Sequence, residues 1–454
     1  MKTATESITT AVQEKIELRA LPQFARGATM YQIFLRQFTS RGTLQAAQEM
    51  IPYLAGLGIK IVYLCPIVEA DDDPDQTHWS ERQRLSGLGN PKNPYRISDY
   101  FKIDPEYGTD EDLASFVNEA HQYDIRVMLD LVYFHCGPHA KLISMEPEYV
   151  VRDENGEPVT GEWHFPLLNF KSEKLREYLY CNMLYFVEKF DIDGYRCDVG
   201  GSIPLDFWEE GRRRIDRIKS EFLMLNEHKG SREQQHLAFD LGYGFRTWGL
   251  LKVMAGEWTA GEYRSKCEKN DPDLRSVNHS DNHDWACDAF EKRNERILPP
   301  GLMDLSLAFI FSFDGMPLLY NGQEIADDNR HSLWANYEYG NHLGIDWRKA
   351  LTLRGQERMA LVKKLVRLRK ELDILEDGKC RYFATDHDEA VFACLRETDK
   401  QKMLCIFNFR AEKLQVHVDG LSFGKTEYIL QNGVNVNGDA ISMEPYSYAW
   451  VFLN

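Results

Sequence analysis

Two residues with opposite charges, Arg196 and Asp198, stand where an apolar run gives way to the glycines at positions 200 and 201. Side chains two positions apart on a strand point to the same side. The guanidinium of Arg196 could therefore hydrogen-bond the carboxylate of Asp198 and keep it ionised, as a nucleophile must be. Taken alone, the pair is more commonly a solvated ion pair at a strand end.

Three further stretches carry groups that could act with this pair: Asp130-Leu-Val-Tyr-Phe-His135, Leu225-Asn226-Glu227-His228 and Asp281-Asn282-His283-Asp284. Retaining hydrolysis of a glycosidic bond needs one carboxylate that attacks the anomeric carbon and one carboxylic acid that protonates the leaving oxygen, roughly 5–5.5 Å apart. The apolar residues before Glu227 would raise its pKa and keep it protonated, whereas Asp198 beside Arg196 should stay charged.

In this order the four stretches resemble the signature regions of the α-amylase family of glycoside hydrolases, glycoside hydrolase family 13. The resemblance assigns the family's catalytic triplet to Asp198, Glu227 and Asp284, the last as the carboxylate that binds sugar hydroxyls. Alone, Asn282-His283-Asp284 could equally be a helix cap. The substrate-binding residues that the resemblance implies are Tyr95, His135, Arg196 and His283, with Asp130 as a support for Arg196.

Near-continuous apolar strands that alternate with helical segments predict a parallel sheet covered by helices. The strand candidates are Met30–Arg36, Ile59–Leu64, Ile125–Leu131, Gly194–Cys197, Phe222–Leu225, Leu237–Phe239, Arg275–Val277 and Pro317–Tyr320. Eight such strands favour a (β/α)₈ TIM barrel, which we place at residues 1–375. A doubly wound sheet is the alternative, but the first strand is not followed by a Gly-rich turn.

Two long connections should rise from the C-terminal end of the barrel, where barrel enzymes bind their substrates. One is a short inserted domain at residues 136–170 after the third strand, with a hairpin signal at Asn155-Gly156. The other runs from Val68 to about Tyr95. Beyond the barrel, short alternating strands separated by turn residues predict an all-β sandwich domain at residues 376–454.

Composition limits the possible partners and the compartment. A formal net charge of −17 argues against nucleic acid and anionic membranes and is compatible with an uncharged sugar. The odd number of cysteines, nine, and their place in apolar runs indicate reduced thiols. Residues from Met1 to Leu18 contain no apolar stretch typical of a signal peptide, so we expect a cytoplasmic protein. The sequence does not indicate its oligomeric state.

No cofactor is predicted, and no metal at the usual site of the family. Many α-amylases bind calcium between the barrel and the inserted domain, and the resemblance puts the ligand positions on Phe134, Leu167 and Ser202. Phe and Leu offer no oxygen ligand to a hard cation. The acidic run from Asp71 to Asp75 could bind a cation, although a solvated loop is the favoured interpretation.

We therefore expect a retaining hydrolase of malto-oligosaccharides or related α-glucans. A transglycosylase, such as a glucanotransferase or trehalose-forming enzyme, would share the covalent intermediate and differ only in its acceptor. A non-catalytic sugar-binding barrel is disfavoured because all three carboxylates are present, and an unrelated barrel enzyme remains open on fold alone. His228-Lys229 replaces the apolar residue common after the family's acid/base glutamate, and Val199 occurs in relatives that cleave α-1,6 bonds. Linkage and endo or exo action are not indicated.

Overall fold

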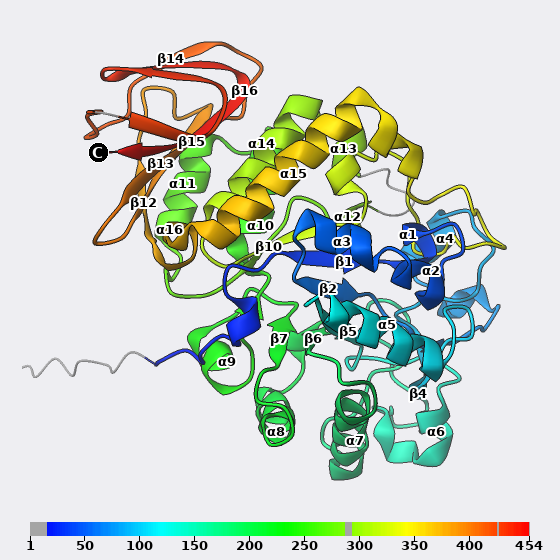
Figure 1. The fold of residues 1–454 in the computed structure, drawn as a ribbon. Helices are drawn as coiled ribbons and strands as arrows, with labels where there is room; N and C mark the ends of the chain where they lie inside the picture. The colour runs from blue at the N-terminus through cyan, green and yellow to red at the C-terminus, as the bar shows by residue number, and fades with distance from the viewer. Residues whose placement is uncertain (1–15, 287–292, 425, 454) are drawn as a thin grey trace, which may run out of the picture.

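A closed barrel of eight parallel strands forms the centre of the computed structural model, which describes residues 16–286, 293–424 and 426–453 (Figure 1). Around the barrel the order is β8-β7-β6-β5-β2-β1-β10-β9, and a parallel bridge between Gly242 and Ser276 joins β8 to β9. The strands are β1 (Met30–Ile33), β2 (Ile61–Leu64), β5 (Arg126–Leu131), β6 (Gly194–Cys197), β7 (Leu223–Asn226), β8 (Leu241–Gly242), β9 (Val277–Asn278) and β10 (Met316–Tyr320). The predicted (β/α)₈ barrel is confirmed.

Helices surround this barrel. The longer ones are α3 (Ile51–Leu57), α5 (Asp110–Gln122), α7 (Glu173–Phe190), α8 (Leu205–Asp216), α10 (Gly244–Met254), α11 (Ala260–Glu268), α14 (Pro300–Ser312) and α15 (Leu353–Glu371). The shorter ones are α1 (Leu35–Phe38), α2 (Leu44–Gln48), α4 (Glu81–Leu85), α6 (Lys141–Met145), α9 (Arg232–Leu237), α12 (His283–Ala286), α13 (Asn294–Ile297) and α16 (Asp373–Asp377). A capping box between Thr109 and Asp112 begins α5, because each side chain accepts a hydrogen bond from the backbone of the other.

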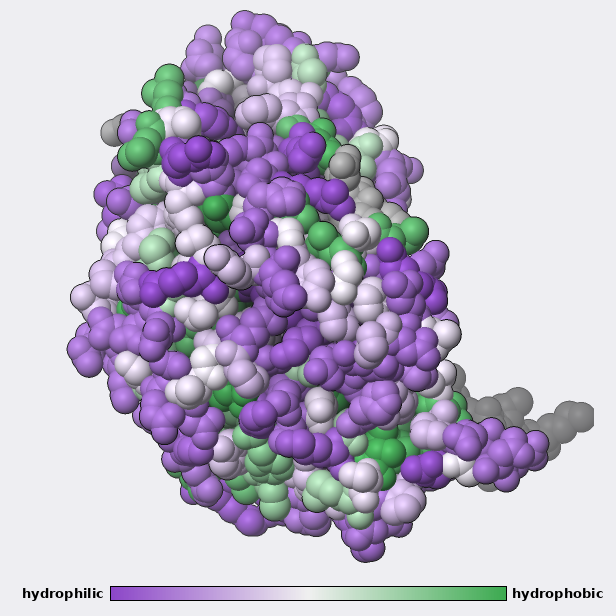
Figure 2. Space-filling view, turned by 90° about the vertical axis from the view of Figure 1, so that its right-hand side faces the viewer, coloured by the Kyte–Doolittle hydropathy of each residue, from purple (hydrophilic) through white to green (hydrophobic). Residues whose placement is uncertain are grey.

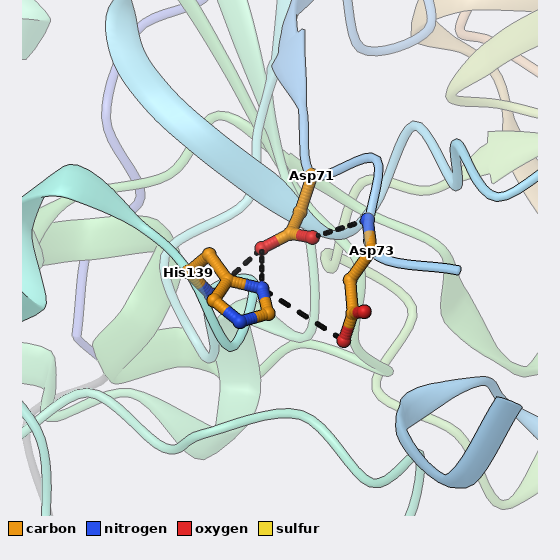
Figure 3. A group of neighbouring side chains, drawn as sticks. All are labelled: Asp71, Asp73 and His139. Carbon is orange, nitrogen blue, oxygen red and sulfur yellow. Dashed lines mark hydrogen bonds and ion pairs between the residues drawn. The ribbon is translucent and has the colours of Figure 1, made fainter. Parts of the chain in front are cut away.

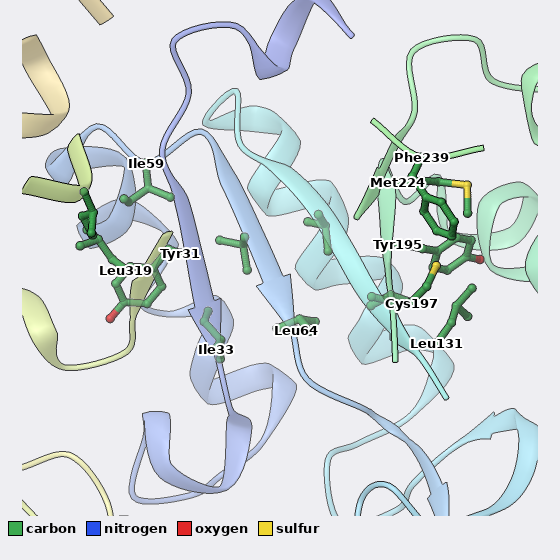
Figure 4. Close-up of a cluster of buried hydrophobic side chains, with 14 of the residues drawn as sticks. Tyr31, Ile33, Ile59, Leu64, Leu131, Tyr195, Cys197, Met224, Phe239 and Leu319 are labelled. Carbon is green, nitrogen blue, oxygen red and sulfur yellow. The ribbon is translucent and has the colours of Figure 1, made fainter. Parts of the chain in front are cut away.

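Alternation along the strands divides the barrel core in two. On β1, Met30 belongs to the cluster that fills the barrel, whereas Tyr31 and Ile33 belong to the cluster between sheet and helices. Figure 4 shows this second cluster, with Leu64 of β2 and Tyr195 of β6 among its members. Residues of even number on β6 therefore point into the barrel, which places Arg196 and Asp198 on the inner side, as the sequence predicts.

Several strand boundaries differ from the sequence prediction. The sixth strand was expected at Leu237–Phe239, but Leu237 ends α9 and the strand is β8, four residues later. The seventh, expected at Arg275–Val277, is β9 and begins at Val277. The first strand ends at Ile33, three residues early, because Leu35–Phe38 forms α1.

Both long connections contain local structure. In the connection that begins at Val68, β3 (Val68–Ala70) pairs antiparallel with β4 (Ile97–Ile103), and α4 lies between these two strands in the sequence. The inserted region carries α6 and isolated antiparallel bridges, among them Arg152 with Pro158. The Asp153–Gly156 turn joins the two residues of this bridge, as the hairpin signal predicts. The backbone N–H of Asp153 donates to the Glu157 carbonyl at 2.9 Å and closes the turn.

The C-terminal residues form one antiparallel sheet of six strands. They are β11 (Lys379–Phe383), β12 (Val391–Glu397), β13 (Lys402–Asn408), β14 (Leu414–Val416), β15 (Thr426–Asn437) and β16 (Ala440–Leu453). The first part of β16 pairs with β14 and its later part with β13, so the two faces of the predicted sandwich belong to one continuous sheet. The domain division at 375/376 stays a prediction, and α16 spans it.

The surface is mainly hydrophilic. Figure 2 turns towards the reader the side on which α1 and α4 lie, and its hydrophobic residues are scattered among polar ones. The helices in the described part of the chain include none with the length and apolarity that a membrane crossing requires. No disulfide joins any two of the eight cysteines within the described residues.

Candidate active site

Four charged side chains converge at the C-terminal end of the barrel because they occupy inward-facing positions of three adjacent strands. Asp130 lies on β5, Arg196 on β6 and Asp198 directly after β6, while Glu227 follows β7. Strand pairing aligns Asp130 with Arg196 and Cys197 with Asn226, so the residues that follow β6 and β7 also lie side by side. The sequence prediction that Asp198 and Glu227 come from neighbouring strands is confirmed.

One guanidinium group, that of Arg196, joins the three carboxylates. Its Nη1 donates to both oxygens of Asp130, at 2.8 and 3.0 Å, and to Oδ1 of Asp198 at 2.7 Å. Its Nη2 forms an ion pair with Glu227. The second oxygen of Glu227 accepts a hydrogen bond from the backbone N–H of Val199 at 2.8 Å. The carboxyl groups of Asp198 and Glu227 are thus held at one cation, within the span of a single guanidinium.

Burial raises the pKa of both carboxyl groups at this cation. For Asp198 burial is the largest cause, Arg196 opposes it, and the nearby charge of Glu227 adds to it. For Glu227 burial again comes first, Arg196 opposes it, and the charge of Asp284 raises the pKa further. The raised pKa of Glu227 is as predicted. Asp198 is predicted to stay charged, but one shared guanidinium does not offset burial and a second carboxylate, so its pKa is raised as well.

Asp284 differs from both. Burial acts to raise its pKa, but the ring of His283 and the guanidinium groups of Arg82 and Arg196 outweigh burial and hold the pKa well below its usual value. Nη1 of Arg82 donates to Oδ1 of Asp284 at 3.0 Å, and Nη2 donates to the Asp284 backbone carbonyl at 3.0 Å. The site therefore contains one carboxylate that stays ionised and a pair that can hold a proton.

A chain of hydrogen bonds fixes Tyr95 and His283. Nε2 of Gln32 lies 2.7 Å from Nδ1 of His283, and Nε2 of His283 lies 2.6 Å from the Tyr95 hydroxyl. That hydroxyl donates to Asp130 at 3.0 Å. The two rings stack at 5.4 Å between centroids and 14° between planes. Burial lowers the pKa of His283, and the charge of Asp284 opposes this shift.

His135 keeps one ring nitrogen available to a ligand. Its Nε2 lies 2.9 Å from the Tyr95 carbonyl, which accepts the N–H, and burial lowers its pKa to about 4. Its Nδ1 is buried and has no hydrogen-bond partner among the described residues. An orphaned acceptor of this kind in a pocket wall could accept a hydrogen bond from a sugar hydroxyl.

These residues surround a pocket of about 580 Å³, including space open to solvent. Six predicted site residues line it, namely Tyr95, His135, Asp198, Glu227, His283 and Asp284. Arg196 and Asp130 lie in direct contact with them. Further residues line the pocket that were not predicted to do so, namely Ser80, Arg82, Asn93, Trp163, Phe165, Val199, Leu333 and Trp334. Most of these lie in the two long connections and in the segment after β10, and only an aromatic such as Trp163 in a polar loop offers a signal in the sequence.

The usual calcium position of the family does not fit a hard cation in this chain. Phe134 and Leu167 come together there, since His135 and Leu167 form a bridge and the backbone N–H of Leu168 donates to the Phe134 carbonyl at 3.2 Å. The ring of Phe134 packs near that of Trp163, at 6.3 Å between centroids. Apolar side chains provide no ligand, so we derive no step through calcium.

Part of the acidic run meets a histidine from the inserted region. Ligand atoms of Asp71, Asp73 and His139 lie within 4.8 Å of one another (Figure 3). Protein groups already satisfy these carboxylates: Asp71 accepts from the backbone N–H groups of Asp73 and His139, and Asp73 pairs with the ring of His78 at 2.6 Å. The cluster joins the two long connections, and because Asp71 and Asp73 are buried, the predicted solvated loop is wrong for these two residues.

Comparison with known proteins agrees with this architecture. A family model described as "Alpha amylase, catalytic domain" matches residues 15–152 and 160–358, and one described as "Maltogenic Amylase, C-terminal domain" matches residues 382–450. A solved structure, the noncanonic maltogenic alpha-amylase AmyB from Thermotoga neapolitana, is similar with a TM-score of 0.78 and 24% identity, covering 95% of this chain and 100% of that one.

Curated relatives are longer than this chain. A cyclomaltodextrinase from a Bacillus species is 25% identical over 402 residues, which cover 81% of this chain and 65% of the relative. An intracellular maltogenic amylase from Bacillus subtilis is 26% identical over 403 residues, covering 81% and 62%. The fold and site define a (β/α)₈ barrel with a carboxylate-lined pocket at the C-terminal ends of its strands. The family match over most of this barrel shows that the chain belongs to the α-amylase family, glycoside hydrolase family 13.

Proposed function

We propose that the protein hydrolyses α-glucosidic bonds of malto-oligosaccharides or related α-glucans with retention of configuration. The observation that carries the proposal is the pair Asp198 and Glu227 on one guanidinium, with an ionised Asp284 in the same pocket. Membership of the α-amylase family and similarity to cyclomaltodextrinases and maltogenic amylases support the same substrate class.

In the first step an oxygen of Asp198 attacks the anomeric carbon while the bond from this carbon to the leaving oxygen breaks. Glu227 gives its proton to that oxygen, and a covalent glucosyl-Asp198 ester remains. In the second step Glu227 takes a proton from water, the water oxygen attacks the same carbon, and the ester bond breaks to release Asp198. The raised pKa of Glu227 suits an acid that must carry a proton near neutral pH.

The remaining residues would hold the sugar. Asp284 accepts hydrogen bonds from hydroxyls of the glucosyl ring, Nδ1 of His135 accepts another, and the ring of Tyr95 offers a stacking surface. His283 donates to substrate only after it exchanges its bond with Tyr95. Asp130 acts indirectly, because its carboxylate fixes the guanidinium of Arg196 on which Asp198 and Glu227 depend.

Asp198→Asn tests the assignment of the nucleophile. We expect the turnover of an aryl α-glucoside and of maltotriose to be abolished while the circular dichroism spectrum is unchanged. A folded variant with ordinary rates would refute the assignment. Incubation of the wild-type protein with α-1,4-, α-1,6- and α-1,1-linked glucosides, followed by identification of the released sugars, defines the linkage.

A transglycosylase is the second candidate. His228 and Lys229 follow the acid glutamate and are exposed, so the leaving-group side offers polar contacts to an incoming sugar as well as to water. Product analysis with and without added acceptor sugar separates the two, because only a transglycosylase makes longer products in proportion to the acceptor. We also propose a cytoplasmic location, which the free thiols and relatives named intracellular support.

A further inference from the structure

Two loops form a continuous wall on one side of the pocket. One is the connection that carries α4, and the other follows β10 and includes Leu333 and Trp334. The side-chain amide of Asn90 donates to the Trp334 carbonyl at 2.9 Å. A β-carbon on Gly340 would lie 3.2 Å from the Leu88 side chain, so the loops also pack together farther from the pocket. The two loops are therefore joined at these two places.

The buried side chain of Arg36 fastens this wall to the barrel. It donates to the Leu333 carbonyl at 2.7 Å and to the Lys92 carbonyl at 3.1 Å, one from each loop. Within α4, the side chain of Gln83 donates to the carbonyls of Asn90 and Pro91, both at 3.1 Å. The wall is thus held by buried hydrogen bonds and is not a loose flap.

The wall faces Glu227 across the mouth of the barrel. In the order β8-β7-β6-β5-β2-β1-β10-β9, the strand diametrically opposite β7 is β1, and its neighbours are β2 and β10. Glu227 follows β7, whereas the two loops of the wall follow β2 and β10. On the side of Glu227 the next residues, His228 and Lys229, are exposed.

This arrangement fixes the direction of a bound glucan, given the proposed function on which the argument rests. The leaving group must lie beside the acid Glu227. In a glucopyranose ring C4 lies opposite the anomeric carbon, so a chain attached to O4 would run away from Glu227 and into the wall. Arg82 lies where the glucan chain would meet the wall, because it lines the pocket and donates hydrogen bonds to both the carboxylate and the backbone carbonyl of Asp284.

We propose that this wall restricts the enzyme to chain ends, and that Arg82 recognises the non-reducing terminal glucosyl residue. A hydroxyl that bonds Asp284 comes within reach of the Arg82 guanidinium, which can donate to it. The free 4-hydroxyl of a terminal residue fits against the wall, whereas the next residue of an internal segment does not. The preferred substrates are therefore linear oligosaccharides with a free non-reducing end, cleaved in an exo manner.

Blocked substrates test the restriction directly. 4-Nitrophenyl α-maltoheptaoside is compared with the same compound whose terminal 4- and 6-hydroxyls carry an ethylidene group, and released fragments are identified by chromatography. We expect the blocked compound to react about 100-fold more slowly or worse, since a site built to bind a hydroxyl rejects its replacement strongly. Similar rates on both compounds would overturn the chain-end proposal and leave the hydrolase proposal intact. Failure to cleave either compound would overturn the chain-end proposal, and failure on the α-1,6- and α-1,1-linked glucosides as well would refute the hydrolase proposal.

Arg82 is tested by Arg82→Ala and Arg82→Lys, with Arg84→Ala as the matched control. Arg84 lies on the same short helix, is exposed, and bonds the Gln76 carbonyl. We expect Arg82→Ala to raise KM for the free substrate about 10- to 100-fold, the effect of losing one charged hydrogen bond, and to reduce discrimination against the blocked one. Arg82→Lys should restore part of both, and Arg84→Ala should change neither. An unchanged KM and discrimination in Arg82→Ala, or equal losses in the Arg84→Ala control, would overturn the role of Arg82.

Discussion

Replacement of Arg36 by methionine should destabilise the protein far more than a typical loss of one ion pair. The side chain of Arg36 is 1% exposed and forms a two-pronged pair with Glu106, with Nε to Oε1 at 2.7 Å and Nη2 to Oε2 at 2.9 Å. Its Nη1 also satisfies the carbonyls of Lys92 and Leu333. Arg36→Met keeps most of the apolar volume but leaves one carboxylate and two carbonyl groups without this donor.

The magnitude follows from burial. Breaking one side of a buried, hydrogen-bonded ion pair costs about 3–5 kcal/mol, because the remaining charge stays desolvated. The control is Arg41→Met, which removes a pair with Glu49 whose side chains are 54% and 67% exposed. An exposed pair of this kind contributes about 0–1 kcal/mol. We therefore expect the two variants to differ by at least about 2 kcal/mol in the free energy of unfolding.

Equilibrium unfolding in urea, followed by tryptophan fluorescence and by circular dichroism, measures this difference. The rate on the blocked maltoheptaoside measures the wall in the same variants. We expect Arg36→Met to lower the unfolding midpoint and to cleave the blocked compound relatively faster, because the two loops lose their common anchor. If Arg36→Met costs no more than Arg41→Met, the anchoring role that we give to Arg36 is refuted.

Further outcomes can be checked with the same protein. Glu227→Gln should lower kcat/KM by about 10²–10⁴ on maltotriose, the usual contribution of a general acid, but much less on an aryl glucoside, whose leaving group needs no proton in the first step; equal losses of kcat/KM on both substrates would contradict the acid role. Arg82→Ala removes a cation that lowers the pKa of Asp284, so this carboxylate should become protonated at a higher pH. The acid limb of the pH profile of kcat/KM should therefore move to higher pH, and an unmoved limb would contradict this role of Arg82. Because burial raises the pKa of Asp198, the wild type loses stability as pH rises from the usual range of a carboxyl group towards that raised pKa, so the melting temperature of Asp198→Asn should rise relative to that of the wild type over this range. A chelator should leave activity and melting temperature unchanged, and a marked fall in either would refute the absence of a calcium requirement.

The barrel could be predicted because buried parallel strands leave a strong signal. Ile61–Leu64, for example, is entirely apolar and is bounded by a helix end at Gly58. The sixth strand was misplaced because β8 has only two residues, while the more apolar Leu237-Ala238-Phe239 lies at the end of α9. A strand this short is defined by its neighbours in the barrel and not by its own composition.

The candidate site, like the fold, could be predicted from the sequence only in part. Asp198 and Glu227 stand at strand ends, where alternation and parallel pairing fix their direction, so the sequence suffices to bring them together. The direction of the Asp198 pKa depends on how many carboxylates share Arg196 and how deeply they are buried, which a linear pattern does not contain. Arg82 lies on a short helix whose place depends on contacts with Trp334, far along the chain, and no local pattern marks it.

The backbone conformation of Val199 matters for any attempt to stabilise this protein by substitution. Its backbone adopts φ 46° and ψ 29°, a left-handed conformation that a β-branched residue rarely takes, and this turn directs its N–H to Glu227. Glycine would adopt the same conformation without steric strain but would also allow others. Selection for heat resistance alone would therefore favour glycine here, and the resulting proteins would have a less well oriented acid.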